Sequence, residues 1–274
     1  MSAPGLTRDE VDHILEIVQR EACIVLEAAN QYLLATRLGD AARRCGQGSP
    51  SELVKKARLF PGGNEYRAII DALTTNETYF LRDPRAWEAL RSGPLAALVE
   101  RRRPQRKLYV WSAASSTGQE ACSVVMGLRE WFRETDSWDV QVHGSDVSSA
   151  AIARAELGKY EQLEVSRGLP ADWLKRHFEQ QGHGFQLRSD LRRRLKFHRM
   201  NLAGRWAALP TFDLVLLRNV LIYFEGVERR KVLERIARQM APDGLLMLSP
   251  QERSHPTAGL FELVDAGSAV YRRV

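Results

Sequence analysis

The sequence has little cysteine and no long apolar run. Its three cysteines are widely spaced and form no Cys-x-x-Cys pair, and its six histidines show no metal-ligand spacing. A disulfide framework and a metal site are therefore not expected. The longest apolar stretch, residues 212–224, is interrupted by an aspartate, an arginine and an asparagine. Since a transmembrane helix needs about 20 apolar residues, we expect no membrane insertion.

Two further signals are absent. The first residues, MSAPGLTRDE, contain no basic segment followed by an apolar run, so no secretory signal is expected. The phosphate-binding pattern GxxxxGKS or GxxxxGKT does not occur, which removes the main support for a kinase or an ATPase. The composition, 44% apolar and 27% charged, is that of a soluble globular protein. Together these features predict a globular protein of the reducing cytoplasm.

Positive charge is unevenly distributed along the chain. There are 40 basic and 34 acidic residues, and cations are concentrated in residues 37–58. These cations are Arg37, Arg43, Arg44, Lys55, Lys56 and Arg58. Such an excess fits an acidic protein, a nucleic acid or an anionic lipid as partner. Most such excesses are charges scattered over solvated helix faces, and both interpretations stay open at this point.

Residues 1–84 are predicted to form a small helical domain. Thr7 and Glu10 have the spacing of a capping box, and apolar residues then recur with a helical period. The Pro-Gly-Gly at 61–63 ends one helix before another begins near Glu65. Residues 85–106 are expected to form a connecting helix whose arginine run at 101–103 is a solvated helix end.

From residue 107 the pattern changes to alternating strands and helices. The expected strands are 108–112, 140–144, 195–198, 212–216 and 244–248. The expected helices are 120–134, 148–157, 172–178 and 228–240. This alternation predicts an α/β domain over 107–274 with a parallel sheet covered on both faces. Such sheets bind ligands at the carboxyl ends of their strands.

Two features follow the first two predicted strands. Small residues at 112–118 let the backbone approach a ligand closely, although an ordinary tight turn has the same composition. Asp146 ends the second strand, where an acid commonly accepts hydrogen bonds from ribose hydroxyls; alternatively, it caps the helix near Ser148. The loop lacks the full GxGxxG pattern, which favours S-adenosylmethionine over NAD as the adenosine-containing cofactor.

Four stretches, spread in order over the chain, resemble motifs of the CheR-type chemotaxis-receptor glutamate methyltransferases. They are Asn76–Pro84 (NETYFLRDP), Trp111–Ser123 (WSAASSTGQEACS), Gly144–Tyr160 (GSDVSSAAIARAELGKY) and Arg218–Phe224 (RNVLIYF). The departures are mild, since Leu81 replaces a usual phenylalanine and Ala121-Cys122 a usual Pro-Tyr pair. They affect packing more than polar contacts.

The resemblance implies a class I, Rossmann-like methyltransferase sheet with an N-terminal helical domain and a short antiparallel subdomain inserted at 179–194. It implies methyl transfer from S-adenosylmethionine to glutamate carboxylates of chemoreceptors, with S-adenosylhomocysteine as the second product. The implied cofactor-binding residues are Asn76, Thr78, Arg82, Glu120, Asp146, Asn201, Leu202, Arg218 and Asn219. Within this set, Glu120 would bind the amino-acid portion, Asp146 the ribose, and residues 201–202 the adenine edge.

Arg82 and Tyr223 are the implied catalytic residues. Arg82 would orient the acceptor carboxylate through paired N–H donors, and Tyr223 would lie near the transferred methyl group. Without the resemblance, the alternative for Arg82 is a salt bridge at the domain junction beside Asp83. The sequence alone favours a buried core phenol for Tyr223.

The implied partner is the cytoplasmic helical domain of chemoreceptors, whose acidic surface would face the cations of 37–58. Family members that bind a C-terminal pentapeptide tether carry extra glycine-containing residues in the subdomain loop, whereas the stretch Glu179–Arg188 is brief here. We therefore expect no tether binding. Two other functions stay open: a non-catalytic sensor of S-adenosylmethionine or its product, and a nucleic-acid methyltransferase, prompted by the basic run at 192–196. No aromatic-interleaved basic motif accompanies that run, so no nucleic acid is expected as partner.

Overall fold

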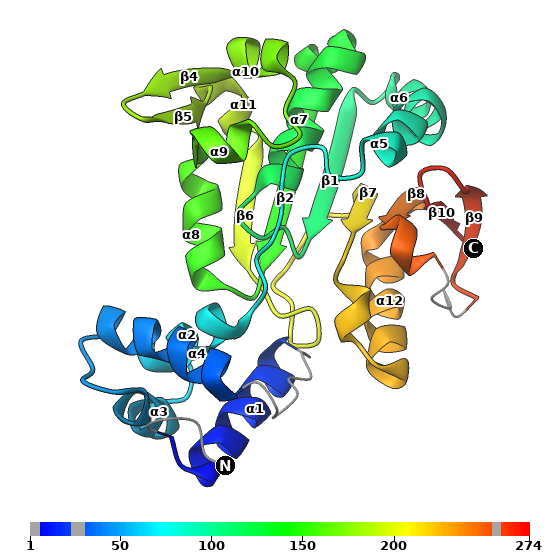
Figure 1. Ribbon diagram of the computed structural model, residues 1–274. Helices are drawn as coiled ribbons and strands as arrows, with labels where there is room; N and C mark the ends of the chain where they lie inside the picture. Colours follow the sequence, from blue (N-terminus) through cyan, green and yellow to red (C-terminus); the bar gives the residue numbers. More distant parts are fainter. Residues whose placement is uncertain (1–5, 23–30, 254–258) are drawn as a thin grey trace.

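The computed structural model describes residues 6–22, 31–253 and 259–274. A small helical domain lies against one end of a larger α/β domain (Figure 1). The helical domain consists of α1 (Arg8–Ala22), α2 (Gln31–Arg44), α3 (Pro50–Leu59) and α4 (Asn64–Leu73). The expected capping box is present, because the Thr7 N–H donates to the Glu10 carboxylate at 2.8 Å and the Glu10 N–H to the Thr7 hydroxyl at 3.3 Å.

The connecting helix is formed by α5 (Pro84–Leu90), a π-helical turn η2 (Arg91–Leu95) and α6 (Ala96–Arg102). The expectation that its arginine run is a solvated helix end is wrong for Arg102. This side chain is only 13% exposed and forms ion pairs with Asp213 and Asp243, each at 2.6 Å. Hydrogen bonding to Arg102 holds the pKa of Asp243 well below its usual range. The arginine therefore fastens the connecting helix to the sheet.

The expected α/β sheet is confirmed. Its strands are β1 (Lys107–Ala113), β2 (Asp139–Asp146), β6 (Leu195–Arg199), β7 (Phe212–Leu217), β8 (Met240–Leu248), β9 (Phe261–Asp265) and β10 (Val270–Arg273). They lie in the order β6-β2-β1-β7-β8-β10-β9. The first five strands are parallel and β10 is antiparallel to β8. The order reverses between β1 and β7, the place where open α/β sheets bind ligands.

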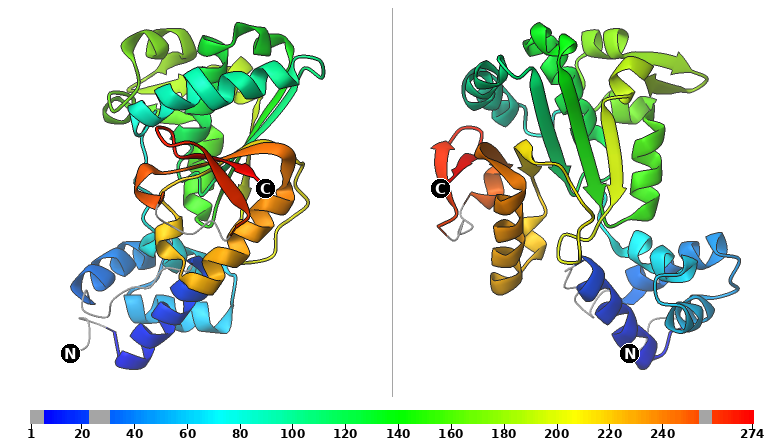
Figure 2. Two further views of the ribbon diagram at one scale, coloured as in Figure 1. Left: turned by 90° about the vertical axis from the view of Figure 1, so that its right-hand side faces the viewer. Right: turned by 180° about the vertical axis from the view of Figure 1, so that it is seen from behind.

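Both faces of this sheet are covered, as Figure 2 shows from two further sides. Side chains alternate along the strands, so that Val110 and Leu214 belong to one buried core while Trp111 and Val215 belong to the other. The first core packs against α5, α6 and α7 (Gln119–Trp131), and the second against α12 (Gly226–Gln239). α8 (Ser149–Leu157) connects β2 to the inserted subdomain.

The inserted subdomain is a small antiparallel sheet of β3 (Lys159–Glu161), β5 (Gly184–Leu187) and β4 (Phe178–Gln181), in that order. Gly182, at φ 63°, makes the tight turn between β4 and β5. The third strand comes from residues 159–161, before the 179–194 stretch singled out in the sequence. α9 (Gln162–Val165), α10 (Ala171–His177) and α11 (Ser189–Arg192) complete this region. In the described residues, no helix combines the length and apolar character needed to cross a membrane.

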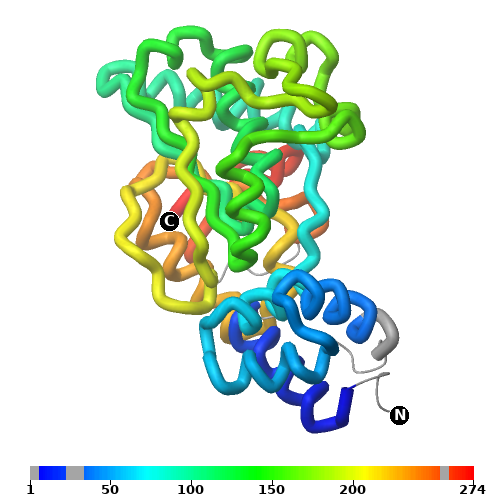
Figure 3. Tube along the Cα trace, turned by 90° about the vertical axis from the view of Figure 1, so that its left-hand side faces the viewer, coloured from blue at the N-terminus to red at the C-terminus, as the bar shows by residue number. Residues whose placement is uncertain are grey.

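Figure 3 shows the helical domain as a separate lobe below the carboxyl ends of the strands, next to the loop between β6 and β7. Residues 74–83 join the lobe to α5 and pass along this edge of the sheet. The Asn201 amide in the β6–β7 loop donates to the Arg20 carbonyl of α1 at 3.4 Å. The two domains therefore meet where a parallel sheet binds its ligands.

Candidate functional site

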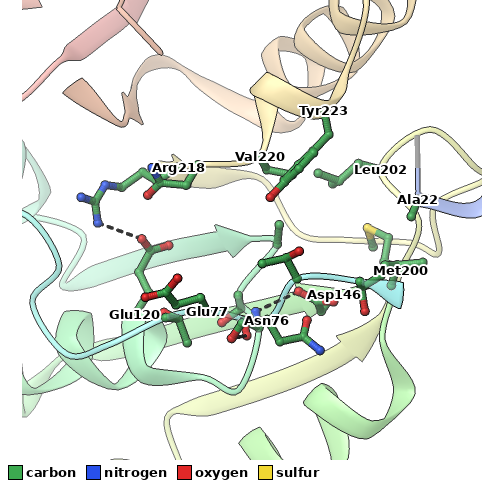
Figure 4. A pocket seen from close by; sticks show the side chains of 18 of the residues that line it. Ala22, Asn76, Glu77, Glu120, Asp146, Met200, Leu202, Arg218, Val220 and Tyr223 are labelled. Atoms are coloured by element: carbon green, nitrogen blue, oxygen red, sulfur yellow. Dashed lines mark hydrogen bonds and ion pairs between the residues drawn. The ribbon is translucent and has the colours of Figure 1, made fainter. Parts of the chain in front are cut away.

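A pocket of about 860 Å³, open space at its mouth included, lies between the helical domain and the carboxyl ends of β1, β2, β6 and β7. Figure 4 shows side chains from both domains pointing into it. Every cofactor and catalytic residue named from the sequence lines this pocket: Asn76, Thr78, Arg82, Glu120, Asp146, Asn201, Leu202, Arg218, Asn219 and Tyr223. The fold thus brings together residues that lie more than a hundred positions apart in the chain.

Asp146 is buried at the end of β2 and is held by backbone donors. Its two carboxylate oxygens accept the Ser116 N–H at 2.8 Å and the Ser148 N–H at 2.9 Å. Burial raises the pKa of Asp146, and the N–H donors oppose that rise. Asp146 is not the helix cap, because Ser148 itself caps α8 by accepting the Ala151 N–H at 3.1 Å. The remaining lone pairs of Asp146 are available to hydroxyl donors of a ligand.

The loop after β1 is shaped by left-handed backbone conformations. Ala114, Ser116 and Gly118 have φ values of 61°, 50° and 91°. These conformations turn the chain around the Asp146 carboxylate and leave the Ser115 hydroxyl buried with no hydrogen-bond partner among the described residues. A buried hydroxyl that lines a pocket without a partner favours a polar ligand there.

Glu120 and Arg218 form a buried ion pair at the other end of the pocket. The Arg218 guanidinium, 1% exposed, donates to Glu120 at 3.0 Å and to Asp83 at 2.7 Å. The Ser112 hydroxyl donates to the second Glu120 oxygen at 2.7 Å. A cation shared by two carboxylates leaves one negative charge in this group, which suits a cationic amino group of a ligand.

Residues 74–83, the segment that joins the domains, are fastened by side chains of the α/β domain. The Ser116 hydroxyl donates to the Asn76 carbonyl at 2.8 Å, and the Leu81 N–H donates to Ser123 at 3.0 Å. Arg218 also donates to the Arg82 carbonyl at 2.8 Å. Two motifs that are distant in sequence, Trp111–Ser123 and Arg218–Phe224, therefore hold this backbone segment over the pocket.

The inserted subdomain contacts the same segment. Gly168 has φ 84°, and a Cβ there would lie 2.0 Å from the Phe80 carbonyl oxygen. Arg167 pairs with Glu77 at 2.9 Å and lies over the Tyr79 ring at 4.2 Å. Only glycine permits this close approach, so the loop before α10 packs directly on the backbone beside Arg82.

The Arg82 guanidinium is not paired with a carboxylate of the described residues. The hydrogen bond from Arg167 lowers the pKa of the Glu77 carboxyl, and the charge of Arg82 is close enough to contribute to this to a smaller extent. It is half-buried, lies over the Tyr79 ring at 5.7 Å and donates to the Glu77 carbonyl at 3.3 Å, and it forms no ion pair with any described residue. The salt bridge with Asp83 that the local sequence allowed is not formed, because Asp83 pairs with Arg218. Arg82 is therefore placed to hold an added anion at the pocket.

Tyr223 points from η4 (Leu221–Tyr223) into the cavity (Figure 4). It is partly exposed, and its hydroxyl has no hydrogen-bond partner among the described residues. The alternative of a buried core phenol is thus wrong. Met200, Leu202 and Val147 provide an apolar part of the pocket wall. The side-chain oxygen of Asn201 accepts the Ala203 N–H at 2.8 Å.

The donor set fits S-adenosylmethionine. A buried carboxylate suits ribose hydroxyls, an apolar wall suits an adenine ring, and the residual negative charge around Glu120 suits the amino-acid portion. No group of three or more histidine, cysteine, aspartate or glutamate side chains that could hold a metal occurs in the described ranges.

The six cations named from the sequence lie outside the pocket lining and differ in their pairing. Arg43 pairs with Asp40, Lys56 with Glu65 and Arg58 with Asp9. Arg37, Arg44 and Lys55 form no ion pair with the described residues. The set is thus partly compensated within the helical domain and partly available to an acidic partner.

Sequence reasoning did not mark several pocket residues. Glu21 and Ala22 reach it from the end of α1, and Met200 from the end of β6. The family motifs do not include these positions. The only available signal was the rule that residues after parallel strands meet at one edge, which points to Met200 but not to α1.

This chain is similar to known proteins over most of its length. The chain matches the family model described as CheR methyltransferase, SAM binding domain, over residues 76–270. It is 34% identical over 261 residues to chemotaxis protein methyltransferase 1 of Pseudomonas aeruginosa, covering 93% of this chain and 94% of the relative. It is 32% identical over 255 residues to chemotaxis protein methyltransferase Cher2 of Pseudomonas putida, covering 91% and 92%.

Proposed function

This chain belongs to the CheR methyltransferase family and uses S-adenosylmethionine, and we propose that its methyl acceptors are glutamate side chains of chemoreceptors. The products are then glutamate methyl esters and S-adenosylhomocysteine. The observation that carries this proposal is Arg82, a pocket guanidinium without a carboxylate partner among the described residues. The paired N–H donors of a guanidinium are well matched to the two oxygens of an acceptor carboxylate.

Methyl transfer to a glutamate carboxylate requires that donor and acceptor be aligned, and it does not require a general base. A glutamate side chain has a reference pKa near ~4.3, so it is already a nucleophile at neutral pH. Bound S-adenosylmethionine supplies a methyl group on a sulfonium sulfur, which is activated toward nucleophiles. The residues of this chain need only hold donor and acceptor in line, a proximity effect of about 7–11 kcal/mol at best.

Each residue has a proposed part in this alignment. Asp146 accepts hydrogen bonds from the ribose, and the group around Glu120 binds the amino-acid portion. Arg82 orients the acceptor carboxylate without proton transfer, and the Tyr223 hydroxyl, which points into the cavity, positions the reacting groups. The carboxylate oxygen forms a bond to the methyl carbon while the carbon–sulfur bond breaks, so no general base takes part.

The proposed macromolecular partner is the acidic, helical cytoplasmic domain of a chemoreceptor, and we place the enzyme in the cytoplasm with it. The proposed docking residues are Arg43, Arg44 and Lys55. Their side chains are exposed, so they can pair with acidic groups of the partner without a rearrangement of the helical domain. Long-range attraction between such surfaces speeds association and falls with salt.

We further propose that docking does not require a C-terminal peptide tether. A peptide that extends a sheet needs an exposed edge strand. The outer strand β4 is short, Phe178–Gln181, and its turn to β5 contains only residues 182–183. Titration with the receptor's C-terminal pentapeptide tests this, and micromolar binding to residues 179–194 would overturn it.

The reaction is tested with labelled methyl donor and membranes that contain the receptors. Base-labile label on a receptor band is expected, and Arg82→Ala should lower kcat by about 10²-fold while thermal stability changes little. The exposed neighbour Arg85 provides the matched control, since Arg85→Ala should retain turnover. Donor binding without transfer would indicate a regulator instead, and salt-sensitive labelling of RNA would indicate a nucleic-acid methyltransferase.

A further inference from the structure

Glu252 is a fully buried carboxylate outside the pocket. It ends the short turn η5 (Pro250–Glu252) that follows β8, and its exposed fraction is 0%. Neither the sequence motifs nor the pocket lining includes it. It forms no ion pair with any lysine or arginine in the described ranges. A buried charge without a counter-ion is costly unless hydrogen bonds replace its hydration.

Five donors surround this carboxylate. Oε1 accepts the N–H groups of Val220 and Leu221 at 2.9 and 2.8 Å. Oε2 accepts the Asn219 N–H at 2.8 Å, and the Ser249 N–H and hydroxyl at 3.1 and 2.6 Å. Three of the five donors are consecutive backbone N–H groups of the segment that follows β7.

The backbone of that segment is shaped to bind an anion. Asn219 has φ 57°, a left-handed conformation that asparagine tolerates better than other side-chain-bearing residues. Such a residue makes successive N–H groups converge on one point, which forms an anion-binding nest. Here the anion is the Glu252 carboxylate of the protein itself. It binds residues 219–221 from the side that faces away from the pocket, since Glu252 does not line the pocket.

The same segment provides one side of the pocket. Arg218, Asn219, Val220, Tyr223 and Phe224 all line it. η4 begins at Leu221, whose N–H is bound by Glu252, and Tyr223 lies at its end. Because the turn is only Leu221–Tyr223, a change in the direction of its first N–H groups changes where the tyrosine points.

We propose that Glu252 is a positioning residue for methyl transfer: its carboxylate holds residues 219–221 so that Tyr223 faces the pocket. The effect on methyl transfer rests on the proposed function, whereas the binding of residues 219–221 by the Glu252 carboxylate does not. Glu252 touches neither the cofactor pocket nor the acceptor site and acts only through the backbone of this segment.

Glu252→Gln tests the proposal, because an amide of equal size replaces one acceptor oxygen by N–H donors that face backbone N–H groups. Hydrogen exchange of the amides at 219–221 should become at least about 10-fold faster, while amides of β1 stay protected. In the methyl-transfer assay, kcat should fall about 10-fold or more, with the KM for receptor within about 2-fold of the parent. Glu262→Gln, the same change at a half-exposed glutamate of β9, should leave both readouts unchanged.

Unchanged exchange at 219–221 in folded Glu252→Gln would overturn the proposal. A uniform rise in exchange over the whole chain, with kcat reduced only by the unfolded fraction, would also overturn it, since that result indicates general instability. If Glu252→Gln does not fold, Ser249→Ala removes one of the five donors and should raise exchange at 219–221 by a smaller factor; no rise would contradict the hold. Exchange needs no substrate, so a parent protein inactive on receptors would defeat the proposed function and leave this test intact.

Discussion

The two sides of the pocket are built in different ways. On the α/β side, charged groups are buried and each has assigned partners: Asp146 binds two backbone N–H groups, and Arg218 binds Glu120 and Asp83. On the side of the helical domain, Arg82 is half-buried, donates to a carbonyl oxygen and lies over an aromatic ring, and it forms no ion pair with a described residue. The cations of α2 and α3 are mostly exposed.

This difference corresponds to the two kinds of ligand. A cofactor has one shape, so dipoles fixed in advance by burial and hydrogen bonds bind it without reorganisation. A receptor surface presents several glutamates in turn, and exposed cations can pair with each of them at little cost. The four experiments that follow test this contrast between a fixed side, with the α/β domain that builds it, and an adaptable side, beginning with the largest expected effect.

Arg218→Met should cause the largest loss. The substitution leaves Glu120 and Asp83 near each other without their shared cation, and breaking a buried pair in this way costs about 3–5 kcal/mol of unfolding free energy. Urea unfolding measures it. Arg43→Met, at a side chain that is 74% exposed, is the matched control and should change stability by less than about 0.5 kcal/mol. Equal losses in the two variants would remove the contrast.

Acid should lower the stability of the α/β domain through His143, which is buried in β2 and does not line the pocket. Burial, with smaller contributions from His198 and Lys196, lowers the pKa of His143 to about 4. The unfolded chain takes up this proton near pH 6.5 and the folded chain only near pH 4, so the free energy of unfolding falls as pH decreases through that window. The loss amounts to about 3 kcal/mol from this group. His143→Leu should flatten the dependence, and a variant with the parent's pH slope would contradict it.

Asp146→Ala should weaken binding of S-adenosylmethionine by about 1–3 kcal/mol, because ribose hydroxyls lose a charged acceptor. Calorimetry measures the affinity, and thermal unfolding separates it from loss of the Ser116 and Ser148 hydrogen bonds. Asp146→Asn keeps one acceptor oxygen and should lie between the parent and Asp146→Ala. Unchanged affinity in a folded Asp146→Ala would reduce Asp146 to a structural residue of the loop.

Reversing Arg43, Arg44 and Lys55 to glutamate should have the smallest effect per residue, about 0.2–1 kcal/mol each, and only on the adaptable side. The expected result is a raised KM for receptor with unchanged cofactor affinity. Rising salt should mimic it, since exposed charges are screened beyond about 8–10 Å. Reversal of Arg106 and Lys107, exposed at the opposite end of β1, is the control. A salt-insensitive KM would show that these cations are merely solvated.

The periodic elements of the fold were predictable from local pattern. The strand expected at 140–144 is β2 (Asp139–Asp146), and the helix expected at 228–240 is α12 (Gly226–Gln239). The strands β3 and β9–β10 were not anticipated. A strand as short as β3 (Lys159–Glu161) exists only because β5 lies beside it, and the pairing of β10 with β8 is likewise a long-range contact.

For the site, residue types and their order along the chain indicated the family, the cofactor and ten of the residues that line the pocket. Local spacing could not decide between partners. It allowed Asp146 as a helix cap and Arg82 as the partner of Asp83, but the tertiary structure gives the cap to Ser148 and Asp83 to Arg218. It also gave no sign of Glu252, whose carboxylate meets backbone N–H groups more than thirty residues earlier. Backbone donors carry no residue identity, so what binds them is decided only when the chain has folded.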